Sequence, residues 1–316
     1  MIPWDSVRPS QIGSVVMATA VVAIGMSRIS LVVVSAPLFG IAVALWLLMV
    51  LAAALRLWLN APGLRAELHQ PAALSVAAST AVLATGFAGL GWLGVAAALL
   101  ILAAGLQFVI VGPVLKRWER PSRGMSFLLA VTVASLSVAA SELARGWHSD
   151  WLVVPAGIYW GLAVVAYCLI ASWFDLGELL RGRGDHWVSG GALAIAALAG
   201  EQIYLRLGGP GQPLEAVVIA LWGAASAAIT ILLVSEVISP RWGYHHLRWT
   251  TVFPLGMYGL CGLTLAQLLN VGALMILARV FVGIGFAVWL LVTAGLFVAS
   301  WARLSHPAQP ESTKVG

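Results

Sequence analysis

Long apolar stretches alternate with short polar segments along the whole chain. Ten stretches are long enough to cross the hydrocarbon core of a bilayer as helices, which takes about 20 residues each. The polar segments between them are too short to hold a separate soluble domain. The pattern predicts an all-α integral membrane protein. Its ten transmembrane helices cover residues 11–27, 33–58, 71–90, 92–115, 126–145, 151–174, 186–206, 214–238, 249–269 and 271–302.

The spacing of the polar segments groups these spans into pairs. Spans three and four are joined by Leu90-Gly91-Trp92 alone, and spans nine and ten by Leu269-Asn270-Val271. On the other side the connections are longer and charged. We therefore expect five helical hairpins in one domain over residues 11–305. Residues 1–10 form a short N-terminal segment and residues 306–316 a disordered tail, both on the same side of the membrane.

Hydroxyl and other polar side chains are concentrated in the odd-numbered spans. This imbalance predicts that the odd helices form an inner ring around a pore and that the even helices face lipid. The alternative is that small and hydroxylated residues only allow helices to pack closely, as they commonly do in membranes. The residues that we expect to line the pore are Thr19, Ser79, Thr80, Ser135, Ser189, Thr250 and Thr251.

Similar residues recur near the ends of the odd spans. Glu142, Glu201 and Gln267 end spans five, seven and nine, at intervals of 59 and 66 residues, and Thr85 lies 57 residues before Glu142. An interval of about one hairpin is typical of a repeat arranged around an axis.

Charged residues are few and unevenly distributed. The chain is 61% hydrophobic and 9% charged, with a mean hydropathy of +0.98, far from the roughly 25% charged of soluble domains. Thirteen of the 17 Lys and Arg residues fall on the side that holds both termini. Cytoplasmic loops carry this excess, so we expect cytoplasmic termini and a location in the plasma or inner membrane. The same bias accounts for the net charge of +5, so nucleic acid is not an expected partner.

The ninth span contains the most specific candidate site. Phe253 precedes Pro254 inside an otherwise apolar helix, and a proline bends a membrane helix where neighbouring groups satisfy the freed carbonyl. An aromatic ring in a narrow apolar constriction can close a pore by excluding water. The alternative is an ordinary packed phenylalanine. By span counting Phe253 lies near the cytoplasmic end, and it reaches mid-membrane only if the helix begins near Tyr244.

Charged side chains mark the opposite, outer mouth. Arg28, Arg145 and Arg206 end odd spans and are expected either to form a positive collar that attracts anions or to extend toward lipid headgroups. Glu142 lies three residues before Arg145 and can neutralise it across one turn. Glu142 and Glu201 either carry protons or form structural ion pairs.

Residues for metal binding or catalysis are not arranged in any recognisable pattern. Cys168 and Cys261 lie in separate spans, and the adjacent His245 and His246 diverge without further ligands at metal spacing. The sequence shows no phosphate-binding loop and no catalytic triad. It therefore predicts no enzyme, no cofactor and no metal site, and it leaves a membrane-embedded enzyme or scaffold as a third, weaker possibility.

Several segments together resemble a known family. FPLGMYGL in span nine, the preceding loop PRWGYHHLRW, HWVSGGALAIAALAGEQ in span seven and MATAVVAIGM in span one are similar to the tellurite-resistance/C4-dicarboxylate transporter family, to which plant guard-cell slow anion channels are related. The resemblance implies ten helices in a quasi-fivefold arrangement, odd helices around a central pore, and a homotrimer. It also implies that the family's pore-closing phenylalanine corresponds to Phe253.

Two functions follow from the residues together with this resemblance. The first is an anion channel or carrier for small inorganic or dicarboxylate-like anions, gated by Phe253. The second is a proton-coupled exporter of organic anions or tellurite that uses Glu142 or Glu201.

Overall fold

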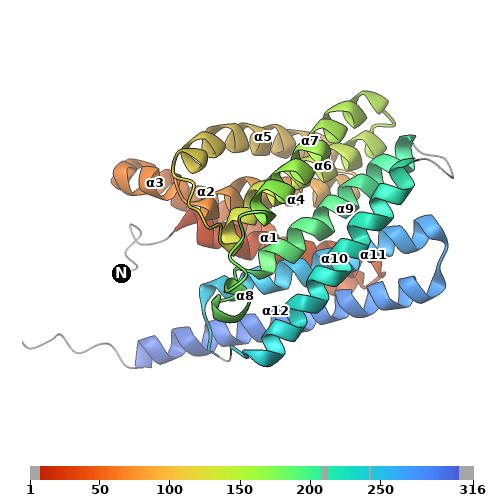
Figure 1. Cartoon of the computed structure of the whole chain (residues 1–316). Coiled ribbons are helices and arrows are strands. Elements are labelled where there is room, and N and C mark those ends of the chain that lie inside the picture. Colours follow the sequence, from red (N-terminus) through yellow and green to blue (C-terminus); the bar gives the residue numbers. More distant parts are fainter. Residues whose placement is uncertain (1–7, 208–212, 242, 306–316) are drawn as a thin grey trace, which may run out of the picture.

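The computed structural model describes residues 8–207, 213–241 and 243–305, and in this part of the chain it is built from helices (Figure 1). Ten helices are long and apolar enough to cross a membrane. They are α1 (Pro9–Arg28), α2 (Val32–Leu59), α4 (Leu74–Gly89), α5 (Leu93–Lys116), α6 (Leu128–Gly146), α7 (Val153–Ala171), α9 (Trp187–Leu207), α10 (Pro213–Ile238), α11 (Trp249–Leu269) and α12 (Gly272–Ser305).

The predicted all-α, ten-span organisation is confirmed, with each long helix ending within three residues of its predicted span. Pro9 and Ser10, which were assigned to the N-terminal segment, already belong to α1. Two short helices in the connections were not predicted, α3 (Ala61–Glu67) and α8 (Glu178–Arg181). The tail at 306–316 lies outside the described residues.

Consecutive long helices pack as five hairpins, namely α1–α2, α4–α5, α6–α7, α9–α10 and α11–α12. The four described turns each contain a residue with positive φ: Ser30 (67°), Gly91 (80°), His148 (51°) and Asn270 (54°). A left-handed residue ends a helix abruptly and lets the chain reverse. We call the end of the bundle that holds these turns the turn end. The opposite end, with α3 and α8, is the loop end.

The hairpins arrange their helices in two shells. Each of five helices contacts the next: α1 packs on α4, α4 on α6, α6 on α9, α9 on α11, and α11 on α1. These five helices therefore close a ring. In their apolar windows 72–94% of residues are buried, against 17–28% in α2, α5, α7, α10 and α12. The outer helices expose large apolar side chains such as Phe108 and Leu291. An apolar exterior of this kind suits a lipid surround.

Glycines in α11 bring this inner helix close to its neighbours. A Cβ on Gly259 would lie 2.7 Å from the Val282 side chain of α12, and one on Gly262 would lie 3.0 Å from Ala278. Gly285 of α12 in turn approaches the backbone of Gly256. Small residues allow such close backbone approach in membranes. One face of α11 is thus committed to packing against α12.

α11 begins at Trp249, after a 3₁₀ turn at His246–Arg248, and continues through Pro254. It does not start near Tyr244. Phe253 therefore lies in the second helical turn, toward the loop end of the bundle, rather than in the middle of the helix.

Candidate functional site

A small cavity of about 30 Å³ lies at the centre of the inner ring and is lined by all five inner helices. On each helix the lining positions are spaced three, four or seven residues apart, as one helical face requires. They are Val21, Ile24 and Arg28 of α1, Val82 and Thr85 of α4, Ser135, Val138 and Glu142 of α6, Ile195, Leu198 and Gln202 of α9, and Met257, Leu260 and Thr264 of α11.

The lining residues fall into layers that repeat with the hairpin interval. The layer nearest the turn end takes one residue from each helix, at intervals of 57, 57, 60 and 62 residues, and we call this layer the neck. It consists of Arg28, Thr85, Glu142, Gln202 and Thr264. The next layer is entirely apolar: Ile24, Val82, Val138, Leu198 and Leu260.

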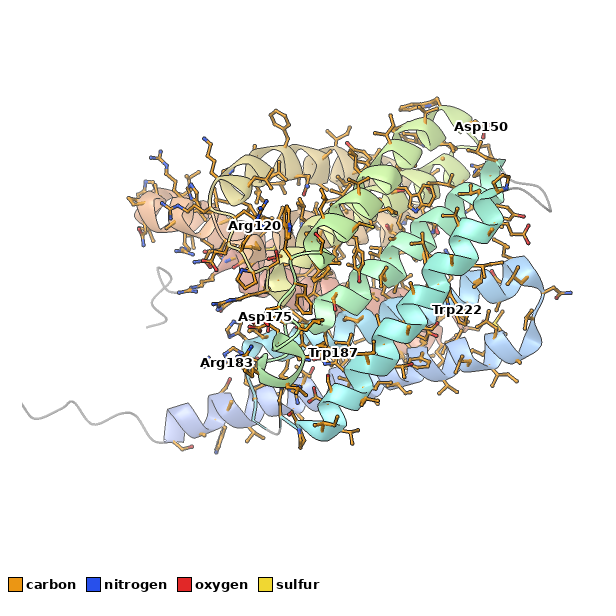
Figure 2. The ribbon with its side chains drawn as sticks, viewed as in Figure 1. Arg120, Asp150, Asp175, Arg183, Trp187 and Trp222 are labelled. Carbon is orange, nitrogen blue, oxygen red and sulfur yellow. The ribbon has the colours of Figure 1, made fainter. Side chains whose placement is uncertain are left out.

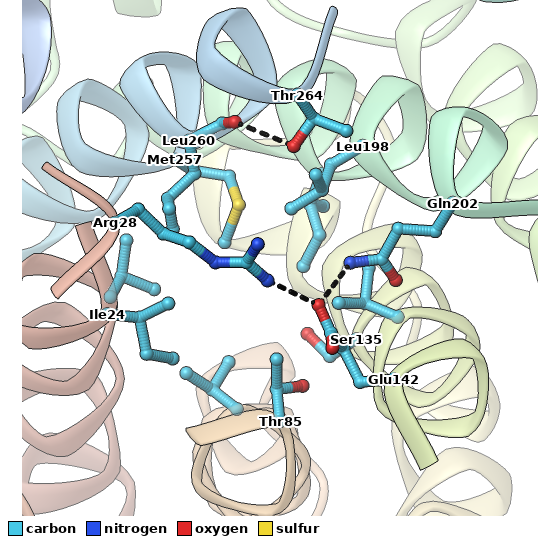
Figure 3. A pocket seen from close by; sticks show the side chains of 14 residues that line it. Ile24, Arg28, Thr85, Ser135, Glu142, Leu198, Gln202, Met257, Leu260 and Thr264 are labelled. Atoms are coloured by element: carbon cyan, nitrogen blue, oxygen red, sulfur yellow. Dashed lines mark hydrogen bonds and ion pairs between the residues drawn. The ribbon is translucent and has the colours of Figure 1, made fainter. Parts of the chain in front are cut away.

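Glu142 is the centre of the polar contacts in the neck (Figure 3). Arg28 extends from α1 and its Nη2 donates to Glu142 Oε1 at 2.6 Å, and Gln202 Nε2 donates to the same oxygen at 3.0 Å. Arg145 Nη2 donates to the other oxygen, Oε2. The Glu142 side chain is only 4% exposed, whereas those of Arg28 and Arg145 are 39% and 56% exposed. The predicted pairing of Glu142 with Arg145 is present, and Arg28 joins it.

A wider vestibule of about 310 Å³ opens beside the neck at the turn end. It shares Arg28, Glu142, Gln202 and Thr264 with the central cavity and adds Arg145 and Arg206, so all three predicted collar arginines line it. Within the described chain its wall also holds buried donors without a hydrogen-bond partner, the Oγ of Ser141 and the Nε and Nη2 of Arg206. Arg206 Nη1 lies 3.8 Å from Asp150, which marks this end of the bundle in Figure 2.

Phe253 lies on the same face of α11 as Met257, one helical turn closer to the loop end. Its side chain is fully buried. Gly191, which lies one turn below Ile195 on α9, is so close that a Cβ there would meet the Phe253 ring at 2.7 Å. Gly191 and Phe253 are 62 residues apart, the same interval that separates Ile195 from Met257. The ring therefore extends from α11 to α9 in the layer below the cavity.

The seven hydroxyl residues predicted to line the pore lie in different places. Ser135 lines the central cavity. Thr19 and Thr80 accept hydrogen bonds from tryptophan indoles of outer helices, Trp289 at 3.0 Å and Trp46 at 2.9 Å. Ser79 lies against Met49 of α2. These three hydroxyls connect the inner ring to the outer shell.

The remaining three hydroxyl residues lie at the loop end. Ser189 donates to the His186 carbonyl at 2.7 Å, and Thr250 donates to the Gly184 carbonyl at 2.9 Å. Thr251 borders a mostly apolar groove among α10, α11 and α12. The structure thus brings only Ser135 of the seven into the central cavity.

Most lining residues are apolar, so a search for polar residues in the inner spans missed them. The hydroxyls that do line the cavity donate to their own helix, Thr85 to Ala81, Ser135 to Val131 and Thr264 to Leu260. The sequence did contain one usable signal. Stepping back by one or two turns from Arg28 or Glu142 reaches the apolar lining of the same face.

Glu201 neighbours Gln202 but faces another direction. It is fully buried, and the Cys261 Sγ donates to its Oε1 at 3.1 Å. Its other oxygen has no hydrogen-bond partner in the described chain. Glu201 lines neither the central cavity nor the vestibule, where Gln202 takes the place that the sequence repeat assigned to Glu201.

A second carboxylate cluster lies at the loop end. Glu236 of α10 accepts from Arg241 Nη1 at 2.9 Å and from Arg248 Nη1 at 2.8 Å, and Trp187 Nε1 lies 3.4 Å away. His186, immediately before α9, is fully buried with both ring nitrogens unpartnered among the described residues. Burial, reinforced by the charge of Arg241, lowers the pKa of His186 to about 4.

The match to a protein family covers this entire architecture. The model of the family described as voltage-dependent anion channel (SLAC1) matches residues 9–297, from the first turn of α1 into α12. The chain belongs to the SLAC1 family. No curated protein matches it. The resemblance found in the sequence is thereby confirmed, because the family relates to the tellurite-resistance/C4-dicarboxylate transporters.

Membership defines the general class of this SLAC1-family chain. It is a multi-pass membrane protein of an anion channel or transporter family, whose members are not enzymes. Small anions and lipid are the partners that the family implies.

Proposed function

We propose that the chain conducts small anions along the axis of the inner ring and that Phe253 closes this path. The observation that carries the proposal is the layered lining, to which every inner helix contributes from one face. The layers run from a vestibule with three arginines, through an apolar layer, to a buried aromatic ring. The arginines attract anions to the mouth, and the apolar layers exclude water unless the ring moves.

The contact with Gly191 supports a closing role for Phe253. The ring occupies space that only a residue without a side chain leaves free. Eleven residues separate Phe253 from Thr264 of the neck, which corresponds to about 16 Å along a helix. The proposed path therefore has a polar end and a closed end within one bilayer thickness.

The orientation and assembly complete the proposal. The excess of Lys and Arg on the loop side supports cytoplasmic termini, in a plasma or inner membrane, with the vestibule outside. A homotrimer and transport of dicarboxylates remain expectations from the family resemblance.

Replacing Phe253 with alanine tests the closing role. The variant Phe253→Ala is expected to raise anion conductance in planar bilayers about tenfold or more, equivalent to a barrier lower by about 1.4 kcal/mol. A matched control is Phe127→Ala, which removes an equally buried ring that packs against Tyr167 and Phe174 outside the lining. An unchanged conductance in Phe253→Ala, or an equal rise in both variants, would refute the gate.

The competing function is proton-coupled export through Glu142 or Glu201. Its support is weaker, because two arginines neutralise Glu142 and Glu201 faces Cys261 rather than the cavity. Anion flux into liposomes with and without a pH gradient separates the two. Flux that follows the gradient and loses this dependence in Glu201→Gln would favour coupling over a channel.

A further inference from the structure

The neck contains a feature that an open anion path does not require, a buried carboxylate on its lining. Glu142 takes the hydrogen bonds of Arg28, Arg145 and Gln202 and is itself 4% exposed. It belongs both to the vestibule and to the central cavity, so it lies where one opens into the other. Any anion that passes between them must come close to this negative charge.

The donors around Glu142 match the two oxygens of a planar oxyanion. Arg28 and Gln202 donate to Oε1, and Arg145 donates to Oε2. Charge-assisted bonds of guanidinium to carboxylate are the stronger class of hydrogen bond. Elsewhere in the neck the hydroxyls of Thr85 and Thr264 donate to backbone carbonyls of their own helices. Glu142 therefore occupies the donor set that an incoming anion would use.

We propose that Glu142 is a tethered anion that fills the binding site of the permeant at the neck and so sets the affinity for anions that arrive from the vestibule. This inference rests on the proposed anion path. A permeating anion must displace the carboxylate from Arg28 and Gln202 before it enters the cavity. Planar oxyanions of carboxylate size compete best, because they reproduce both ends of the contact, whereas a spherical halide does not.

The vestibule supplies the first contacts for such an anion. Ser141 Oγ and two nitrogens of Arg206 are buried there without hydrogen-bond partners in the described chain. Buried donors of this kind are costly unless a ligand or water satisfies them. They lie in the wall of the space from which the anion would attack the Glu142 contact.

The test uses the full chain in liposomes, with formate and chloride as probes and Glu142→Gln as the variant. Glutamine keeps the shape of Glu142 but carries no charge, so the arginines become available. The half-saturation concentration for formate is expected to fall about tenfold, and that for chloride by less than about threefold. The matched control is Glu201→Gln, which alters an equally buried carboxyl that faces away from the lining. It is expected to leave both values unchanged.

Direct binding separates this inference from the proposed function. Formate-dependent thermal stabilisation of purified wild type and Glu142→Gln in detergent is measured alongside flux. If the wild type moves no anion, the proposed path fails, yet a stronger formate shift in the variant still supports the tethered anion. Equal formate affinity in both proteins overturns the inference even if flux is present. If Glu142→Gln raises the affinity for chloride as much as that for formate, the proposed preference for planar oxyanions is wrong.

Discussion

Each end of the bundle holds one glutamate between two arginines, and the two arrangements differ in position, in the exposure of the arginines and in their backbone contacts. Glu142 with Arg28 and Arg145 borders the central cavity, whereas Glu236 with Arg241 and Arg248 lies off the axis among α9, α10 and the start of α11. Arg241 also donates to the carbonyls of Gly182 and Leu179, which fixes the loop around α8. The same combination of one Glu and two Arg thus lines the central cavity and the vestibule at one end and joins loop segments at the other.

This difference shows that the residue types of an ion pair do not determine what the pair does; its surroundings do. Arg28 and Arg145 are 39% and 56% exposed, while Arg241 and Arg248 are 15% and 19% exposed and contact backbone. Accessible arginines can exchange one anion for another. Arginines held by carbonyls and by a carboxylate at the same time cannot do so without loosening the loop.

Removing the Glu236 carboxylate should have the largest of the expected effects, a loss of thermal stability. Glu236→Ala leaves Arg241, Arg248 and the Trp187 indole without their acceptor, and breaking such a pair costs about 3 kcal/mol. Thermal unfolding in detergent should show this loss, while the half-saturation for formate stays unchanged. Asp175→Asn is a suitable control, because its partner Arg181 is exposed and such pairs contribute at most about 1 kcal/mol. A change in formate affinity in Glu236→Ala would remove the distinction between the two ends.

Acid should weaken the loop end through His186. Its pKa is lowered to about 4 by burial and by Arg241 and Arg248, with Glu236 acting in the opposite direction. In the unfolded chain the usual value is about 6.5, so between these values the unfolded state binds the extra proton and stability falls as pH falls. From pH 7 to pH 5 the loss is about 2 kcal/mol, and stability is fully present above pH 6.5.

The pH dependence of thermal unfolding measures this contribution. His186→Phe should remove most of it, because the variant cannot titrate and the native ring nitrogens have no hydrogen-bond partner in the described chain. His69→Phe, at a half-buried loop position, should retain the full dependence. Parallel pH curves for wild type and His186→Phe would contradict the prediction.

The smallest expected effect sharpens the role of the turn end. Once Glu142 is neutral, Arg145 should contribute to formate binding, so formate affinity in Glu142→Gln combined with Arg145→Gln is expected to be about threefold lower than in Glu142→Gln alone. Arg145 is 56% exposed, which limits its share. Thermal unfolding of the double variant should match that of Glu142→Gln. If the double variant binds formate as tightly as Glu142→Gln, then Arg145 does not bind the second oxygen of the anion.

Apolar length and turn residues were sufficient to predict the ten helices and their pairing, because a bilayer allows few alternatives for a run of about 20 apolar residues. The inner and outer shells also followed from the distribution of polar side chains. The direction in which each side chain points could not be predicted in this way. Thr19 and Thr80 looked like pore residues, but each accepts a hydrogen bond from a tryptophan of an outer helix, a long-range contact that no local pattern encodes.

The neck illustrates the same limit. The sequence repeat suggested Glu201 as the equivalent of Glu142, and one residue further along the helix turns the side chain by about 100°. Gln202 therefore reaches the cavity and Glu201 packs against Cys261. A repeat read by chemical similarity misses this shift, because Glu201 lies 59 and Gln202 lies 60 residues after Glu142 and only the direction of the helix face separates the two.

The two faces of each inner helix have consequences for how such a chain can diversify. One face is joined to the outer shell through contacts such as Trp289 with Thr19, and the other presents a single side chain to the neck. Five positions, one on each inner helix, thus make up the polar layer of the neck, and three of them, Arg28, Glu142 and Gln202, also join their helices to one another. Substitutions at these five positions would change the charge and hydrogen-bonding groups that line the neck, while the contacts between the inner and outer helices stay the same.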